Sequence, residues 1–351
     1  MTSHVQLIFP PEAFPTPPPG EGHLPARIVQ AHRERYVALC ALGELWVTLK
    51  SSVGHALAQH SDMPTVGDWV YVQADPQGAS RITALMPRRT TFSRPDETGK
   101  RSQVVAVNFD TVLVVTSLNK DFNARRIERY LAAAYESGAQ PVVVLTKADL
   151  CPDPIPYLRQ IESAVPGVPA LALSNATGEG LAQLAPYLTP GSTLVLLGMS
   201  GVGKSSLVNA LTGQDTMAVR AIREDDARGR HTTTHREMIL LPGGAMIIDT
   251  PGMRELGLWD TEQGLSDAFA DITELAQDCK YRDCTHRHEP GCAVQAAVAA
   301  GTLDDKRLSS YFTLRREAER HAPTSQARWA VVQQRKAFAK ASRQQEQGKW
   351  E

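Results

Sequence analysis

The chain has 351 residues, of which 42% are hydrophobic and 21% are charged, and its formal net charge is −1. This length exceeds one ordinary hydrophobic core and predicts two or three domains. No apolar run reaches the roughly 20 residues that a membrane span requires, and no basic segment followed by an apolar run marks a signal peptide. We therefore expect a soluble, cytoplasmic protein without a membrane partner.

The N-terminal region divides into a leader and a small β-rich domain. Residues 1–25 are expected to be a disordered leader, because six of the ten residues 10–19 are prolines, which suit neither a helix nor a sheet ladder. Residues 26–90 contain about five short alternating runs separated by turn residues, a pattern that predicts a barrel of OB type. A small β-domain without a ligand remains an open alternative for this segment alone.

Residues 91–262 show the pattern of an α/β domain. After a basic loop at residues 88–95, which is expected to be a linker, apolar strand-like runs alternate with helical runs. Continuous apolar strands separated by helices predict a doubly wound, parallel sheet that is covered on both faces. The strand-like runs are 111–116, 141–146, 192–197 and 245–249, and the helix-like runs are 124–137 and 204–211.

A phosphate-binding loop follows one of these strands. Residues 198–205 match G-x-x-x-x-G-K-[ST] and open a helical run. The glycines let backbone N–H groups close around phosphates, Lys204 adds positive charge, and Ser205 can ligate Mg²⁺. The residues expected around the phosphates are Gly198, Met199, Ser200, Gly201, Val202, Gly203, Lys204, Ser205 and Ser206.

Two further segments suggest guanine as the base. Residues 146–149 (Thr-Lys-Ala-Asp) resemble the N-K-x-D motif of GTPases, with threonine in place of asparagine. A carboxylate can accept both N1–H and the exocyclic amine of guanine, and a lysine stem can lie along the base. Residues 174–181 resemble the base-contacting loop that comes next in GTPases. The residues expected at the base are Thr146, Lys147, Ala148, Asp149 and Ser174.

The order of the motifs is unusual. Residues 249–252 (Asp-Thr-Pro-Gly) resemble the D-x-x-G switch, in which Asp249 holds Mg²⁺ through water and Gly252 contacts the γ-phosphate. An ordinary GTPase presents its base motif last, whereas here it precedes the phosphate loop. We therefore expect a circularly permuted GTPase whose new ends are anchored by flanking domains. Our hypothesis is that the nucleotide state passes mechanically from the second switch to the C-terminal domain.

The residue that directs the attacking water is a separate question. Met253 occupies the place of the glutamine that orients water in Ras-like enzymes. The segment 228–235 lies where the first switch belongs, and its threonines, Thr233 among them, can supply a Mg²⁺ ligand. His231 in this segment can reach a water, although a histidine in a polar loop is often merely solvated. Catalysis by His231 is therefore a hypothesis.

Residues 263–351 are expected to form a helical, zinc-binding domain. Cys279, Cys284, His286 and Cys292 lie within fourteen residues, and His288 competes with His286 for the fourth position. A closed Cys₃His shell around Zn²⁺ is structural, because no position is left for water. Free thiols are the alternative.

The C-terminal tail is basic. Between residues 306 and 351 there are eleven Lys or Arg against four Asp or Glu, amid Trp329 and Phe338. This spacing suits contact with phosphates and occasional base stacking, although a solvated helical face is the usual meaning of such a charge run.

The combined motifs resemble the ribosome small subunit-dependent GTPase A (RsgA) family. The resemblance rests on the permuted order, residues 229–234 (Gly-Arg-His-Thr-Thr-Thr), residues 249–252 followed by Met-Arg-Glu-Leu, and the cysteine cluster ending in Glu-Pro-Gly-Cys-Ala-Val. It implies an OB barrel, a permuted GTPase and a zinc domain that bind small-subunit rRNA during late maturation, with hydrolysis stimulated by the subunit. It also implies that His231 is catalytic and that His286 is the zinc ligand.

The expected ligands and partners are therefore GTP or GDP with Mg²⁺, one structural Zn²⁺, and the small ribosomal subunit with its rRNA, bound by a monomer alongside other assembly factors. A non-catalytic, GTP-sensing RNA-binding factor is the first alternative. An ATP-using kinase or transporter subunit is the second, and Asp149 argues against it.

Overall fold

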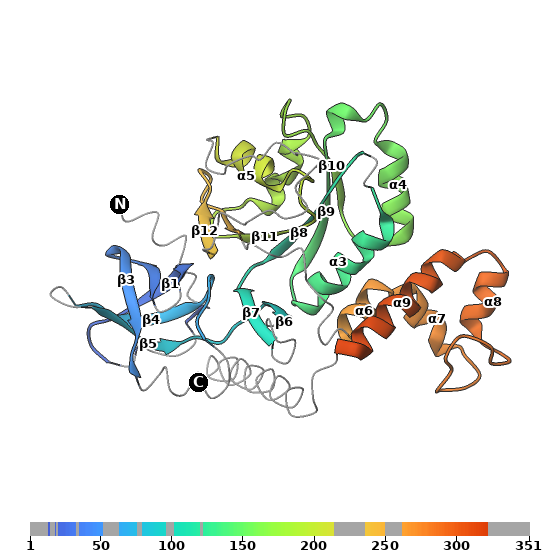
Figure 1. Cartoon of the computed structure of the whole chain (residues 1–351), viewed down its shortest axis with the longest axis horizontal. Helices are drawn as coiled ribbons and strands as arrows, with labels where there is room; N and C mark the ends of the chain where they lie inside the picture. Colours follow the sequence, from blue (N-terminus) through green and yellow to red (C-terminus); the bar gives the residue numbers. More distant parts are fainter. Residues whose placement is uncertain are drawn as a thin grey trace, which may run out of the picture.

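The computed structural model shows a barrel, a central α/β domain and a group of C-terminal helices (Figure 1). Among the residues it describes, none of the helices combines the length and the apolar character that crossing a bilayer requires. The described residues are 13, 14, 18, 20–32, 35–51, 63–75, 79–95, 102–119, 122–213, 236–249 and 262–321.

The N-terminal strands close into a five-stranded barrel in the order β1-β2-β3-β5-β4, with β4 returning to β1. The pairing of β3 with β5 is parallel and the other pairings are antiparallel. This is the strand order of an OB barrel, and small and branched side chains fill its interior. The strands are β1 (His23–Ala31), β2 (Tyr36–Cys40), β3 (Gly43–Leu49), β4 (Trp69–Gln73) and β5 (Ser80–Leu85).

The barrel takes in part of the expected leader. Strand β1 begins at His23, and the ring of Phe14 lies 5.5 Å from Trp69 and 5.3 Å from Tyr71. Ala13 is buried beside these rings. The prediction of disorder over residues 1–25 is therefore wrong for these positions, because apolar side chains between the prolines pack on the barrel.

The segment that follows the barrel is a hairpin and not the expected loop. Strand β6 (Thr91–Pro95) pairs antiparallel with β7 (Ser102–Val107). Phe92 of β6 is buried and stacks on Phe109, with ring centroids 4.8 Å apart. The prediction of a linker loop is wrong from residue 91 onward, because Phe92 anchors the hairpin in the core of the central domain.

The central sheet has the order β10-β9-β8-β11-β13-β12. The first five strands are parallel, and β12 runs antiparallel to β13. Every residue of β8 and β11 is buried, which explains their unbroken apolar sequences. The strands are β8 (Thr111–Ser117), β9 (Gln140–Thr146), β10 (Ala170–Ala172), β11 (Thr193–Leu197), β12 (Arg236–Leu240) and β13 (Met246–Asp249).

Helical segments cover both faces of this sheet, which confirms the doubly wound architecture. Alternate strand residues enter two separate cores: Val112 belongs to one and Leu113 to the other. Helices α3 (Ala124–Glu136) and α4 (Ile155–Ala164) contribute to the first core. Helix α5 (Lys204–Thr212) and the 3₁₀ helix η3 (Leu181–Tyr187) contribute to the second.

The C-terminal helices pack on α3 and extend the first core. Gly264 of α6 lies so close to α3 that a Cβ atom would stand 2.3 Å from the carbonyl oxygen of Ala132. Figure 1 shows α6 and α9 beside α3, with α8 at the far end. These helices are α6 (Glu262–Ala268), α7 (Ala270–Gln277), α8 (Ala293–Ala299) and α9 (Asp305–His321).

A buried ion-pair network joins these helices to the central domain. Arg307 of α9 binds Asp271 through Nε and Nη2, at 2.6 and 2.7 Å, and Glu128 of α3 through Nη1 at 3.1 Å. Ser310 also donates a hydrogen bond to Glu128. The guanidinium lies 4.6 Å from the ring centroid of Phe269. Each of the three guanidinium nitrogens of Arg307 therefore donates to a carboxylate or to a backbone carbonyl group.

Candidate nucleotide and metal sites

The phosphate loop connects β11 to α5, as the sequence predicts. A Cβ atom at Gly198 would stand 2.2 Å from the carbonyl oxygen of Val115, so this position accepts only glycine. The Lys204 ammonium folds back over the loop and donates to the carbonyl oxygens of Gly198 and Met199, at 2.7 and 2.6 Å. The loop thereby presents backbone and a cation at a helix N-terminus, the arrangement that binds phosphate.

The predicted base loop touches the phosphate loop, although the two lie far apart in the sequence. The Thr146 hydroxyl is 2.5 Å from the carbonyl oxygen of Val202 and 3.2 Å from that of Thr116. Lys147 donates to the carbonyl oxygen of Gly201 at 2.9 Å. Parallel strands bring their carboxyl ends to one edge of the sheet, and this edge is where both loops begin.

Ser174 fixes the carboxylate that was predicted to read the base. Its hydroxyl donates to Asp149 Oδ1 at 2.5 Å and accepts the backbone N–H groups of Ala176 and Thr177 at 3.2 Å. Asp149 itself is exposed. A surface carboxylate held in one orientation is suited to a directional, two-acceptor contact.

Asn175 makes a contact with the phosphate loop that the sequence did not predict. Its side-chain amide donates to the carbonyl oxygen of Gly203 at 3.0 Å and so ties the second base loop to the phosphate loop. Its Oδ1 is buried and has no hydrogen-bond partner among the described residues. The position directly after Ser174 is the signal that could have identified it.

The structure describes only some of the residues that were predicted to lie near Mg²⁺ and the γ-phosphate. Ser205 and Ser206 are half-buried in the first turn of α5. Asp249 ends β13, where its backbone pairs with Glu237, but its side chain lies outside the described part. His231, Thr233 and Gly252 also lie outside the described residues.

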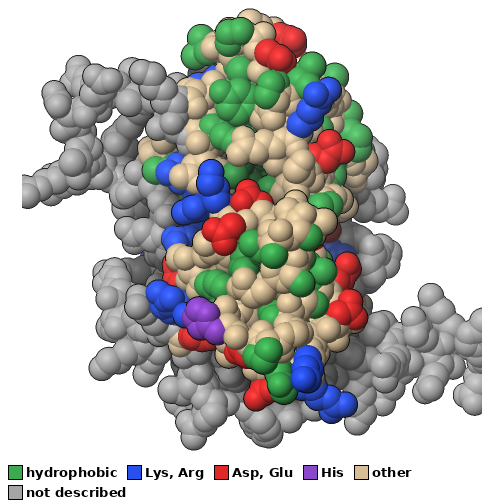
Figure 2. All heavy atoms as spheres, turned by 90° about the vertical axis from the view of Figure 1, so that its right-hand side faces the viewer, with side chains coloured by type: hydrophobic (Ala, Val, Ile, Leu, Met, Phe, Trp, Pro, Cys, Tyr) green, Lys and Arg blue, Asp and Glu red, His purple; other side chains and the backbone are tan. Residues whose placement is uncertain are grey.

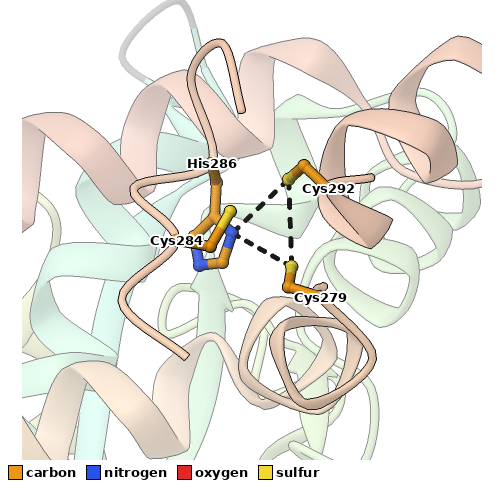
Figure 3. Close-up of side chains that lie close together, drawn as sticks. All are labelled: Cys279, Cys284, His286 and Cys292. Carbon is orange, nitrogen blue, oxygen red and sulfur yellow. Dashed lines mark hydrogen bonds between the residues drawn. The ribbon is translucent and has the colours of Figure 1, made fainter. Parts of the chain in front are cut away.

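The four predicted metal ligands converge (Figure 3). The ligand atoms of Cys279, Cys284, His286 and Cys292 all lie within 4.8 Å of one another. Cys279 Sγ is 3.9 Å from Cys292 Sγ, and His286 Nδ1 is 3.5 and 3.6 Å from these two sulfurs. A tetrahedral zinc shell places sulfurs about 3.8 Å apart and a sulfur and a nitrogen about 3.6 Å apart. The residues therefore fit a tetrahedral Cys₃His metal.

The loop between Cys284 and Cys292 is organised around the Glu289 carboxylate. Glu289 accepts the backbone N–H groups of Thr285, Arg287 and His288 at 3.0 to 3.1 Å, together with the Thr285 hydroxyl. The Thr285 hydroxyl, followed by the backbone N–H groups of Thr285, Glu289 and Arg287, holds the pKa of Glu289 well below its usual range. His286 takes a left-handed φ of 61° there.

His286, and not His288, points into the cluster. His286 is buried, whereas His288 is exposed and is absent from the group of converging ligands. Burial, and next the positive charge of Arg315, lower the pKa of His286. A lowered pKa keeps the imidazole neutral at neutral pH, which is the state that binds metal.

Comparisons with known proteins agree with this architecture. Residues 85–259 match the RsgA GTPase family model. A Lactiplantibacillus plantarum protein, small ribosomal subunit biogenesis GTPase RsgA 2, is 46% identical over 296 residues, 84% of each chain. The crystal structure of YjeQ from Thermotoga maritima has a TM-score of 0.64 at 25% identity and covers 84% of this chain and 98% of its own. The crystal structure of YloQ, a circularly permuted GTPase, has a TM-score of 0.63 at 24% identity, and the alignment covers 86% of this chain and 97% of YloQ. At this identity the likeness supports the fold only.

Proposed function

The chain belongs to the RsgA GTPase family, and on that premise we propose that it hydrolyses GTP to GDP and phosphate in late maturation of the small ribosomal subunit. The observation that carries the proposal is the meeting of the 146–149 loop with the phosphate loop, in reversed sequence order, at one edge of the sheet. The name of the Lactiplantibacillus plantarum relative supports the cellular role.

In the proposed complex, the two loops hold opposite ends of one nucleotide. Lys204 and the backbone of residues 198–206 bind the phosphates, and Ser205 ligates Mg²⁺. Asp149 accepts N1–H and the exocyclic amine of guanine, and the Ser174 hydroxyl keeps its carboxylate in place. The stem of Lys147 lies along the base.

We assign hydrolysis to the switch residues. His231 directs the attacking water, Thr233 supplies a second Mg²⁺ ligand, and Asp249 and Gly252 act as the D-x-x-G switch. The support for these roles is the family membership and the position of the residues in the sequence. Met253, which follows the D-x-x-G residues, offers no hydrogen bond to water.

Zinc is the metal that we propose for the Cys₃His cluster. It would be held by Cys279, Cys284, His286 and Cys292, and no ligand position would remain for water. Zinc supplies rigid cross-linking there, and the Glu289 carboxylate orients the loop that carries His286. We therefore assign the metal a structural role.

The proposed partner is the small ribosomal subunit with its rRNA, bound in the cytoplasm by a monomer together with other assembly factors. OB barrels commonly bind oligonucleotides. On the face shown in Figure 2, basic and acidic side chains are interspersed. The basic excess of the sequence lies in residues 306–351, of which 322–351 are outside the described part. We therefore assign the main phosphate contacts to this C-terminal segment.

The test is GTP hydrolysis by the purified chain with and without purified small subunits. We expect turnover to rise when subunits are added and to fall in His231→Ala, while GTP affinity is retained. Bound GTP without hydrolysis under either condition would favour a GTP-sensing RNA-binding factor. Failure to bind guanine nucleotides would contradict both functions.

A further inference from the structure

The barrel is joined to the hairpin that lies between the two switch segments. Strand β1 pairs with β12 through Gln30 and Glu237, and Glu237 pairs in turn with Asp249 at the end of β13. These three residues form one row across three adjacent strands, about 10 Å wide at the usual strand spacing. The segments 214–235 and 250–261, which adjoin this hairpin in the sequence, lie outside the described residues.

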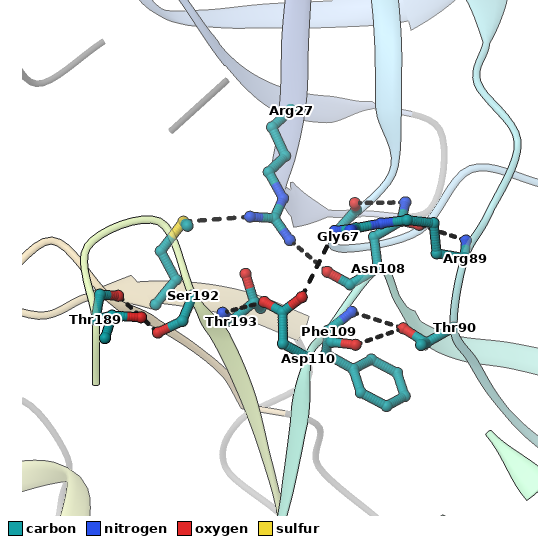
Figure 4. Close-up of polar contacts among 11 residues, drawn as sticks. Arg27, Gly67, Arg89, Thr90, Asn108, Phe109, Asp110, Thr189, Ser192 and Thr193 are labelled. Atoms are coloured by element: carbon teal, nitrogen blue, oxygen red, sulfur yellow. Dashed lines mark hydrogen bonds and ion pairs between the residues drawn. The ribbon is translucent and has the colours of Figure 1, made fainter. Parts of the chain in front are cut away.

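A buried arginine joins the barrel to the other end of β13. Arg27 of β1 is 1% exposed and reaches out of the barrel. Its Nη1 donates to the Met246 sulfur at 3.4 Å, and its Nη2 donates to the carbonyl oxygen of Asn108 at 2.8 Å (Figure 4). The guanidinium also lies 4.4 Å from the ring centroid of Trp69. Arg27 therefore bridges the barrel, the first residue of β13 and the entry to β8.

This arginine is poorly satisfied for a buried charge. Its Nε has no hydrogen-bond partner among the described residues, and a thioether sulfur is a weak acceptor. Burial lowers the pKa of Arg27 to about 9, although nearby Asp110 opposes that shift. A buried cation with such partners adds little to stability compared with an apolar side chain of similar size. The location of Arg27 between the barrel and β13 therefore calls for an explanation other than stability.

The surrounding contacts leave little room for independent movement. A Cβ atom at Gly67 would stand 2.0 Å from the carbonyl oxygen of Val107 and 3.2 Å from Ile248 Cδ1 of β13. The Asn108 side chain donates to the carbonyl oxygen of Gly67 at 3.0 Å and accepts the Arg89 backbone N–H at 2.9 Å. Closely packed contacts of this kind shift together and do not deform separately. A displacement of β13 would therefore also displace β1.

We propose that the β12–β13 hairpin is a relay between the barrel and the nucleotide site, and that Arg27 is the positioning residue that couples β13 to the barrel. The proposal rests on the proposed function, because a guanine nucleotide is the ligand at one end. A partner that moves β1 would displace the row that ends at Asp249. By reciprocity, the nucleotide state would change the barrel's affinity for that partner.

Amide hydrogen exchange on the full chain, with GDP or a non-hydrolysable GTP analogue, tests the relay without ribosomes. We expect exchange in β1 and β12 to differ between the two nucleotides, while exchange in β3 does not. Couplings between sites are commonly about 5- to 150-fold in equilibrium constant, which sets the size of the difference. In Arg27→Met, the difference in β1 should become smaller, because only the backbone pairing of Gln30 with Glu237 still links the barrel to the hairpin, while the protection of α5 by either nucleotide remains.

Arg81→Met is the matched control, because Arg81 is exposed on β5, which pairs with β3 and β4. This variant should keep the difference in β1. If Arg27→Met does not fold, Arg27→Lys replaces it, since one ammonium cannot span both acceptors as the guanidinium fork does.

The possible results separate the two proposals. Identical β1 exchange with both nucleotides, together with protection of α5, would overturn the relay and leave the proposed function intact. A full β1 difference in Arg27→Met would remove Arg27 from the relay. If neither nucleotide protected α5, the proposed function would fail and the relay with it.

Discussion

The central domain is flanked by two joints, and each contains a buried arginine that stacks on an aromatic ring. Arg307, at the C-terminal joint, binds two carboxylates and a backbone carbonyl group. Arg27, at the barrel joint, has one carbonyl oxygen, one sulfur and an unpaired Nε. The same residue type therefore serves two purposes: Arg307 stabilises the first joint, and Arg27 holds the barrel in contact with the β12–β13 hairpin.

Arg307→Met should break the stable joint and have the largest effect on folding. The substitution leaves Glu128 buried and without its cation, and breaking such a pair costs about 3–5 kcal/mol of unfolding free energy. Urea denaturation measures this loss. Arg315→Met, which removes an exposed pair with Glu319, is the control and should cost less than about 1 kcal/mol. Equal losses in the two variants would contradict the assignment.

Gly264→Ala should weaken the same joint by a steric route. The added methyl group would stand 2.3 Å from the carbonyl oxygen of Ala132, which is backbone and cannot move independently. Overpacking of this kind costs about 1–3 kcal/mol. The midpoint of urea unfolding should fall, and a midpoint equal to that of the wild type would show that α6 can move away from α3 without loss.

The loss in Arg307→Met should depend on pH. Burial raises the pKa of Glu128 above its ordinary value of 4.5, against opposing contributions from Ser310 and Arg307. Without Arg307, this pKa should rise further. A group whose folded pKa is raised contributes stability that is present below its unfolded pKa and is lost as the pH rises through its folded pKa.

The destabilisation by Arg307→Met should therefore be smaller near pH 5 than near pH 8, by up to about 1.4 kcal/mol for each further unit of pKa shift. Parallel urea titrations of wild type and variant at both pH values measure the difference. A loss that does not change with pH would mean that Glu128 finds another partner.

Arg27→Met should have the smallest effect on stability and so sharpen the contrast between the joints. Neither nearby carboxylate would be abandoned, because Asp68 keeps Arg88 and Asp110 keeps Arg89 and the Thr193 backbone N–H. The carbonyl oxygen of Asn108 loses this donor, which costs about 1–3 kcal/mol, and the removal of a buried cation offsets part of that cost. We therefore expect a smaller loss of unfolding free energy than in Arg307→Met. A loss as large as that of Arg307→Met would show that the barrel joint is also built for stability.

Local sequence patterns predict those motifs and strands that can be identified without knowing their tertiary contacts. The phosphate loop is read from eight consecutive residues, and the cysteine cluster from fourteen. The strand runs were predicted because unbroken apolar sequence has few other uses in a globular domain. The prediction of a circular permutation is also confirmed, because the order of the motifs is visible in the sequence itself.

The two joints could not be predicted in this way. Arg27 and Met246 are 219 positions apart, and the sequence around each gives no sign of the other. Gly67 lies in a turn, where glycine is common, and only the fold shows that its close approach to Val107 excludes a side chain. Phe14 was hidden by the prolines around it. Each of these roles depends on tertiary contacts, which neither composition nor periodicity records.

The most direct test of the central claim is the nucleotide preference of Asp149→Asn. An asparagine amide offers one acceptor and one donor, which match N1–H and the C2 carbonyl group of xanthine but not the exocyclic amine of guanine. We expect the ratio of the affinity for GTP to the affinity for xanthosine triphosphate to be lower in the variant than in the wild type by a factor on the order of 10⁴. Unchanged preference for GTP would contradict the account, since Asp149 and the phosphate loop would then not bind one nucleotide.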